Sequence, residues 1–210
     1  DALEYYAEEA RRIYGEVFPT DRANRRSLVI KQPVGPVAAI GPWNYPVLLL
    51  SWKVAPALAA GCTVVAKPPS VTPLAVTAFL ACLQEAGLPP GVLNIVMGSG
   101  NRVGRALVQH PLIRKIAMTG QTETGKEIMR MAADGLKRIS LELGGQCPLI
   151  VAPDADLDQA AYGAAYRAFR NMGQICNAVN RIYVHEAVYE PFVERLVEEA
   201  RRLRIGNGLQ

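Results

Sequence analysis

The apolar residues of this chain form short runs of four or five residues, separated by longer stretches in which they recur every three or four positions. Gly and Pro bound many of the short runs, which predict buried strands, and the longer stretches predict helices. The predicted strands are 37–40, 63–66, 92–96, 115–118 and 139–142, and the predicted helices between them are 47–60, 73–86, 101–109 and 122–133. This alternation predicts an α/β fold with a parallel sheet covered by helices on both faces.

Both ends of the chain depart from this rhythm. At the amino end, apolar residues keep helical spacing over 2–18, which predicts one amphipathic helix, and 27–32 alternates weakly as a strand would. After Gly144 and Gly145 the rhythm restarts. The elements predicted there are strands 149–151 and 181–184 and helices 157–169 and 187–204.

These changes divide the chain into three predicted segments, 1–34, 35–144 and 145–210. The last holds only about 65 residues, which is small for an independent hydrophobic core. Neither end resembles a natural terminus. We therefore expect a chain truncated at both ends.

Composition excludes several classes of function. Half of the 210 residues are apolar, and the net charge of +4 is spread along the chain. The basic pairs at 25–26 and 201–202 are short and lack interleaved aromatics, so no nucleic-acid partner is expected. The most apolar stretch, 47–66, is interrupted by Lys53, Pro56 and Gly61, so no membrane span is expected.

The cysteines argue against a metal site. The four cysteines lack CxxC spacing and only two histidines are present, so we expect no zinc. Cys62 and Cys82 lie in apolar stretches and are interpreted as small core residues. The pattern indicates a reducing compartment, and we expect a cytoplasmic protein.

Three short runs carry candidate chemistry. Cys176 ends the run 169–176, Glu142 opens an E-L-G-G run 34 residues upstream, and Asn44 lies in a Pro-Trp-Asn-Tyr-Pro segment. A thiolate can attack a carbonyl, a carboxylate can activate water, and an amide can stabilise an oxyanion. Each residue also has a structural interpretation: a buried cysteine, a glutamate bound by loop amides, and an asparagine serving a turn.

The three runs, in this order, resemble the aldehyde dehydrogenase superfamily over essentially all 210 residues. The resemblance implies that Cys176 attacks an aldehyde to give a thiohemiacetal, that Asn44 donates to the oxyanion, and that Glu142 activates the water that hydrolyses the thioester. One residue departs from the pattern, because Gln146 stands where the family commonly has Lys or Asn. The resemblance also implies a Rossmann-like dinucleotide-binding domain over 35–144.

Within that division, 1–34 is expected to hold a helix and an interdomain or oligomerisation strand. Residues 145–210 are expected to be the start of a second α/β domain, which is catalytic. The full-length protein is expected to be a homodimer or homotetramer, and the fragment alone is expected to be inactive. The expected partner is a small-molecule aldehyde.

A nicotinamide cofactor follows from the chemistry, because no side chain can accept the hydride that leaves a thiohemiacetal. The resemblance assigns cofactor binding to Pro42, Trp43, Lys53, Lys67, Ser70, Gly100, Gly104, Thr119, Gly120 and Gln121. Gly100 and Gly104 belong to a GxGxxxG turn, and Gln121 stands where the family often has Ser. Ser70 replaces the Glu typical of NAD-preferring members, so NADP is expected to be tolerated or preferred over NAD.

Arg170, six residues before Cys176, resembles an arginine with which succinate-semialdehyde dehydrogenases bind the substrate carboxylate. The second arginine of those enzymes is replaced here by Trp52. The resemblance therefore points to an acidic semialdehyde or a small aliphatic aldehyde, while a helix-end salt bridge is the alternative role of Arg170.

Two other functions remain open at this stage. A coenzyme-A-acylating dehydrogenase would generally lack the hydrolytic glutamate, so Glu142 argues against it. A non-catalytic binding or structural protein with the same fold is disfavoured because Asn44, Glu142 and Cys176 are all present.

Overall fold

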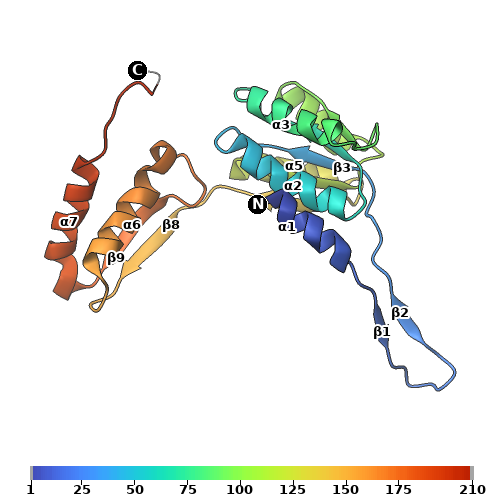
Figure 1. The fold of residues 1–210 in the computed structure, drawn as a ribbon, viewed down its shortest axis with the longest axis horizontal. Helices are drawn as coiled ribbons and strands as arrows, with labels where there is room; N and C mark the ends of the chain where they lie inside the picture. Colours follow the sequence, from blue (N-terminus) through green and yellow to red (C-terminus); the bar gives the residue numbers. More distant parts are fainter. Residues whose placement is uncertain (1, 209–210) are drawn as a thin grey trace. The chain divides into compact units, whose positions relative to one another are not determined.

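The computed structural model describes residues 2–208, which divide into two compact units. Unit 1 runs to Leu143 and unit 2 begins at Gly144. The predicted amino-terminal segment 1–34 clusters with the main sheet in unit 1. Figure 1 shows the elements of each unit.

Unit 1 contains a five-stranded parallel sheet. Its strands are β3 (Val37–Ile40), β4 (Val64–Lys67), β5 (Leu93–Ile95), β6 (Lys115–Thr119) and β7 (Arg138–Glu142). They lie in the order β5-β4-β3-β6-β7, and every neighbouring pair is parallel. The predicted α/β fold is confirmed.

Helices cover both faces of this sheet (Figure 1). Packed on one face are α2 (Pro46–Ala59) and α3 (Leu74–Glu85), and on the other α4 (Arg105–Gln109) and α5 (Thr122–Ala133). Side chains of β3 alternate between them, since Val37 and Ala39 join the first core and Ala38 the second. The predicted helix 101–109 differs at its start, because Gly100–Gly104 is a π-helical turn.

The amino end forms a helix and a hairpin. Its elements are α1 (Ala2–Glu9), a 3₁₀ turn (Ala10–Arg12), β1 (Glu16–Phe18) and β2 (Ser27–Val29). The predicted helix over 2–18 is therefore wrong beyond Arg12, because β1 pairs antiparallel with β2. Gly15 permits this change, since a Cβ there would lie 2.6 Å from the carbonyl oxygen of Val29. All six strand residues of the hairpin are exposed.

Unit 2 is a smaller α/β layer. Its elements are β8 (Cys147–Val151), α6 (Leu157–Phe169), a 3₁₀ turn (Arg170–Gly173), β9 (Val179–Val184), a second 3₁₀ turn (Glu186–Val188) and α7 (Tyr189–Arg201). The two strands are parallel, and the core is formed by Val151, Ala161, Ala164 and Phe192. The predicted helix 187–204 is correct only for its central part, because a 3₁₀ turn precedes it and it ends at Arg201.

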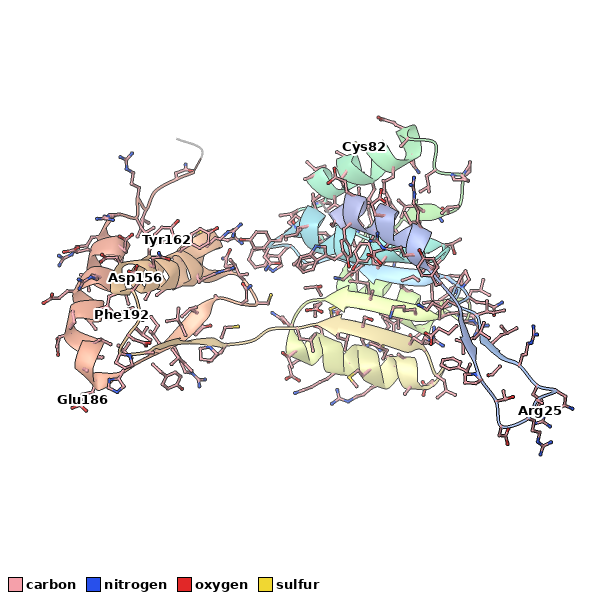
Figure 2. All side chains as sticks on the ribbon, turned by 60° about the horizontal axis from the view of Figure 1, so that its bottom comes forward. Arg25, Cys82, Asp156, Tyr162, Glu186 and Phe192 are labelled. Carbon is pink, nitrogen blue, oxygen red and sulfur yellow. The ribbon has the colours of Figure 1, made fainter. Side chains whose placement is uncertain are left out.

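The cysteines divide between core and surface. Cys62 is 4 % exposed in the first core, as predicted. Cys82 is exposed, so its predicted core position is wrong (Figure 2). It lies on the outer face of α3, where Val76 and Leu80 fill the inner face.

The described residues meet the requirements of neither a membrane span nor a metal cluster. None of the helices within 2–208 combines the length and hydropathy needed for a bilayer span. Over the same residues, no group of three or more His, Cys, Asp or Glu side chains is arranged to hold a metal ion.

Candidate active site

The carboxyl ends of the five parallel strands meet at one edge of the sheet in unit 1, as parallel strands require. The predicted residues at or just after these ends are Pro42, Trp43, Asn44, Lys67, Ser70, Gly100, Thr119, Gly120 and Glu142. Ladder partners at this edge are Ile40 with Lys67 and Thr119 with Glu142. Residues up to 100 positions apart in sequence are thus gathered at one edge.

Asn44 lies in a bend between β3 and α2. Pro42 is buried, Trp43 is exposed, and Asn44 is half-buried. A hydrogen bond from outside this bend fixes its backbone, since the Thr72 hydroxyl donates to the carbonyl oxygen of Trp43 at 3.0 Å. The segment is non-helical up to Pro46, where α2 begins.

Lys67 is the last residue of β4 and is 4 % exposed. Its Nζ donates to the carbonyl oxygen of Pro68 at 3.1 Å, and burial lowers the pKa of this ammonium. Lys67 is therefore shielded from solvent although it ends a strand. A buried cation with spare donors at a sheet edge is suited to a polar ligand.

Ser70 connects two of the predicted cofactor elements. Its exposed hydroxyl donates to the carbonyl oxygen of Gly98 at 3.2 Å, which joins the turn after β4 to the turn after β5. Gly98 has φ +145°, and a Cβ there would lie 2.4 Å from Val103, so only glycine fits.

The glycines of these turns also test whether the edge suits a dinucleotide. A Cβ added at Gly100 would meet nothing within 4 Å, and Gly100 is exposed, so the backbone there is open to close approach, whereas Gly104 is buried. Gln121 is exposed at the N-cap of the 12-residue α5 and makes no side-chain capping bond. The open backbone, the helix N-terminus and the buried Lys67 together fit an anionic nucleotide.

Lys53 meets Thr119 in the interior of unit 1. Lys53 is 7 % exposed in α2, and its Nζ donates to the Thr119 hydroxyl at 2.5 Å and to the Leu49 carbonyl oxygen at 3.0 Å. Burial lowers the pKa of Lys53 to about 8, and the negative charge of Glu142 opposes that shift. The sequence motifs contained no signal for this pair, whose members are 66 positions apart.

Glu142 ends β7 with an exposed side chain. Its carbonyl oxygen accepts from the Gly120 amide at 3.0 Å, which ties the end of β7 to the turn after β6. Unit 1 does not bury this carboxylate.

A cavity of about 810 Å³ lies beside these residues in unit 1. Lys53 and Glu142 supply charged groups to its wall, and Tyr5, Tyr6 and Trp52 supply aromatic ones. Such a mainly apolar cavity with a few polar groups is typical of small-molecule sites.

Lys53 gives a first testable prediction. Since its folded pKa of about 8 lies below the ordinary 10.5, the folded state carries the cost of a buried charge below pH 8. That cost is relieved as pH rises from 8 to 10.5, where the unfolded chain still binds the proton. In the wild type, the free energy of unfolding should therefore rise by on the order of 3 kcal/mol between pH 8 and 10.5. Lys53→Met should remove this rise.

Urea unfolding of the full-length protein at a series of pH values measures the effect. Lys126→Met is the matched control, because that lysine is exposed on α5 and paired with Glu123. An unchanged pH slope in Lys53→Met would show that the lysine is not the buried titrating group.

Cys176 lies in unit 2, exposed in a turn before β9. Three consecutive residues upstream adopt left-handed backbone conformations: Asn171 (φ 51°), Met172 (φ 57°) and Gly173 (φ 73°). Two of them are not glycine, and such strain is concentrated at functional sites. These residues form a turn shortly before the cysteine, and Cys176 is exposed to solvent.

Arg170 follows α6 and stacks on an aromatic ring of the same helix. Its guanidinium carbon lies 5.2 Å from the ring centroid of Tyr166, and Arg167 lies 6.0 Å from the same ring. Tyr166 in turn stacks on Tyr162 at 6.0 Å. Tyr166 was missed in the sequence, although its i,i+4 spacing to Arg170 on a predicted helix was a usable signal.

Comparison with known proteins identifies the chain's relatives. The model of the aldehyde dehydrogenase family matches residues 1–210. A probable NADP⁺ succinate-semialdehyde dehydrogenase of Sinorhizobium fredii is 52 % identical over 98 % of the chain and 42 % of its own length. The mitochondrial succinate-semialdehyde dehydrogenase of Arabidopsis thaliana is 49 % identical over 99 % of the chain and 39 % of its own length.

Solved structures agree with these matches. The crystal structure of an NADP-dependent enzyme of E. coli superposes with a TM-score of 0.97 at 48 % identity, covering 100 % of this chain and 44 % of the other. The chain spans about two fifths of the length of the curated relatives it matches. Because the family model covers every residue, the chain belongs to the aldehyde dehydrogenase family.

Proposed function

We propose that the protein containing this chain oxidises an aldehyde to a carboxylic acid with NADP or NAD. The observation that carries the proposal is the sheet edge of unit 1, which gathers Asn44, Lys67, Thr119 and Glu142 in a member of this family. Unit 2 contributes Cys176, exposed at a strained turn.

Cys176 is the proposed nucleophile. Its thiolate attacks the aldehyde carbon, and the resulting thiohemiacetal carries an oxyanion that the Asn44 side-chain amide stabilises by donating a hydrogen bond. Removing one such donor typically costs roughly 3 kcal/mol of transition-state stabilisation. A bound nicotinamide supplies the hydride acceptor.

Glu142 is the proposed base for the second half of the reaction. The thioester on Cys176 must be hydrolysed, and a carboxylate at the end of β7 can accept a proton from the attacking water. Its exposed side chain leaves it accessible to water. This role separates a hydrolytic enzyme from one that transfers the acyl group to coenzyme A.

The cofactor is proposed to bind along the turns after β3, β4, β5 and β6. Lys67 and Ser70 would hold the adenosine ribose, Lys53 would lie near the nicotinamide ribose, and Pro42 and Trp43 would also contact the cofactor. The pyrophosphate would lie against the open backbone at Gly100, with Gly104 buried behind it, and against the turn of Thr119, Gly120 and Gln121 that precedes α5. Names of relatives support both cofactors, since one is NADP⁺-dependent and a Bacillus cereus aldehyde dehydrogenase was solved with NAD⁺.

Ser70 should set the cofactor preference. Ser70→Glu places a carboxylate where a 2′-phosphate would lie, so kcat/KM for NADP should fall at least about tenfold while that for NAD is kept or improved. Ser70→Ala, which removes the hydroxyl without adding charge, should cost less than about fivefold with either cofactor.

Steady-state kinetics with both cofactors measures this prediction. A wild-type protein with a strong preference for NAD, or a Ser70→Glu variant that keeps its NADP activity, would contradict the role of Ser70.

We propose an acidic semialdehyde or a small aliphatic aldehyde as substrate. Arg170 supports the first, because the Tyr166 ring fixes a guanidinium that can bind a carboxylate. Arg170→Ala should raise KM for carboxylated aldehydes about tenfold or more and leave uncharged aldehydes unaffected.

Arg167→Ala is the matched control, since it removes the other guanidinium beside the same ring. Equal effects of Arg170→Ala on charged and uncharged aldehydes would assign it a structural role.

The proposed function as a whole is tested by screening aldehydes against both cofactors with the full-length protein. Acid formation without coenzyme A is the expected product, whereas acyl-coenzyme A would favour the acylating alternative. We further propose a cytoplasmic protein that assembles as a homodimer or homotetramer, consistent with four free cysteines and an exposed β1–β2 hairpin.

A further inference from the structure

A second thiol lies beside Cys176 in unit 2. The sulfur of Cys147 is 3.9 Å from the carbonyl oxygen of Cys176, and both cysteines are free. The other two cysteines of the chain, Cys62 and Cys82, belong to unit 1. The fold thus pairs the thiol proposed as nucleophile with one particular cysteine.

The parallel strands of unit 2 produce this pairing. Cys147 opens β8 and is in register with Val179, the first residue of β9, and Cys176 lies three residues before that strand. The chain just before Cys147 also lies close to Cys176, because a Cβ added on Gly145 would lie 3.2 Å from the carbonyl oxygen of Cys176. Cys147 is half-buried and Cys176 is exposed, so oxidants reach Cys176 first.

The geometry leaves a short distance to be closed. A disulfide requires Cα atoms roughly 4.4–6.8 Å apart and correctly directed Cβ atoms. The Cys147 sulfur lies 3.9 Å from the carbonyl oxygen of Cys176, and a disulfide would require rotation about the Cα–Cβ bond of Cys176 and a shift of its turn. The strained residues Asn171 and Met172 favour such a shift, because leaving the left-handed region relieves their strain.

We propose that Cys147 is a resolving thiol that captures oxidised Cys176 as an intramolecular disulfide. The Cys176 thiolate attacks a peroxide, the O–O bond breaks, and Cys176 becomes a sulfenic acid. The Cys147 thiolate then attacks the Cys176 sulfur and expels hydroxide, forming the S–S bond. Two thiols lose two electrons and two protons in total, and hydrogen peroxide is reduced to two molecules of water.

The consequence is protection of the nucleophile. Without a nearby thiol, a sulfenic acid proceeds to sulfinic and sulfonic acids, which thiol reductants do not reverse. A disulfide is reopened by thiol–disulfide exchange. The proposal builds on the proposed role of Cys176 as a reactive thiolate, but the disulfide is detected without any activity measurement.

The experiment uses the reduced full-length protein, treated with hydrogen peroxide and then alkylated. Peptide mapping under non-reducing conditions should find a Cys147–Cys176 linked peptide that disappears with dithiothreitol. In Cys147→Ser, sulfinic and sulfonic forms of Cys176 should increase at least about fivefold, with an equal loss of reductant-recoverable thiol. Cys82→Ser should behave as wild type, and thermal unfolding checks that each variant is folded.

Three results would overturn the proposal. They are a link from Cys176 to Cys82 or to another molecule, equal over-oxidation of Cys176 with and without Cys147, and resistance of Cys176 to peroxide. Cys147→Ala serves as a second variant if the serine form unfolds. A linked peptide in a protein without dehydrogenase activity would refute the proposed function and leave this inference standing.

Discussion

Replacing Cys176 with serine should lower kcat for aldehyde oxidation by at least about 10⁴-fold, the order found when a catalytic nucleophile is removed. A serine hydroxyl is almost fully protonated at neutral pH, whereas a thiol is partly ionised and intrinsically more nucleophilic. The variant should still fold, because Cys176 is exposed and fills no core. The measurement is the initial rate of NADPH or NADH formation in the full-length protein.

Cys82→Ser is the matched control, since that cysteine is also exposed but lies on the outer face of α3. It should keep the wild-type rate. A Cys176→Ser variant that keeps about a tenth of the wild-type rate would exclude the covalent mechanism.

Replacing Glu142 with glutamine should separate the two halves of the reaction. The side chain keeps its shape and loses the ability to accept a proton, so steady-state turnover should fall by about 10²–10⁴-fold, the usual contribution of a general base. Formation of the thioester should be affected far less. Rapid mixing should therefore show a burst of reduced cofactor, approaching one equivalent per active site, followed by slow turnover.

Glu123→Gln is the control for a lost carboxylate in unit 1, because Glu123 forms only an exposed ion pair with Lys126. It should show neither the burst nor the loss of rate. If Glu142→Gln instead slows the burst itself and the later turnover equally, Glu142 acts before the thioester forms.

The regular elements followed from the sequence where local pattern and burial agree. Helices 122–133 and 157–169 have the bounds predicted from apolar spacing, and strand 37–40 is likewise as predicted. Each has apolar residues on the side that its neighbours bury.

Where long-range pairing competes with local pattern, the sequence was misleading. Residues 13–17 keep helical spacing, yet Val17 pairs with Leu28 in a hairpin. Cys82 lies among apolar residues, but it is two positions from Leu80 and so lies on the opposite face of α3. The first could not be predicted from local periodicity, whereas the second could have been read from helical spacing.

Contacts between segments far apart in the chain could not be predicted from the sequence. The hydrogen bond between Lys53 and Thr119 joins α2 to the end of β6, and the approach of Cys147 to Cys176 depends on the parallel pairing of β8 with β9. Residue type alone does not reveal such neighbours, because they depend on strand order and register. Both contacts alter the chemistry expected of the residues involved.

The most direct test of the proposed covalent mechanism is mass spectrometry of full-length Glu142→Gln protein. The protein is mixed with an aldehyde that the wild type oxidises and with the oxidised cofactor, and the reaction is then quenched with acid. The account predicts an acyl group, equal in mass to the acid product less water, on the peptide that contains Cys176, formed only when cofactor is present. Reduced cofactor produced in the burst without any acyl group on Cys176, or with the group on another cysteine, would contradict it.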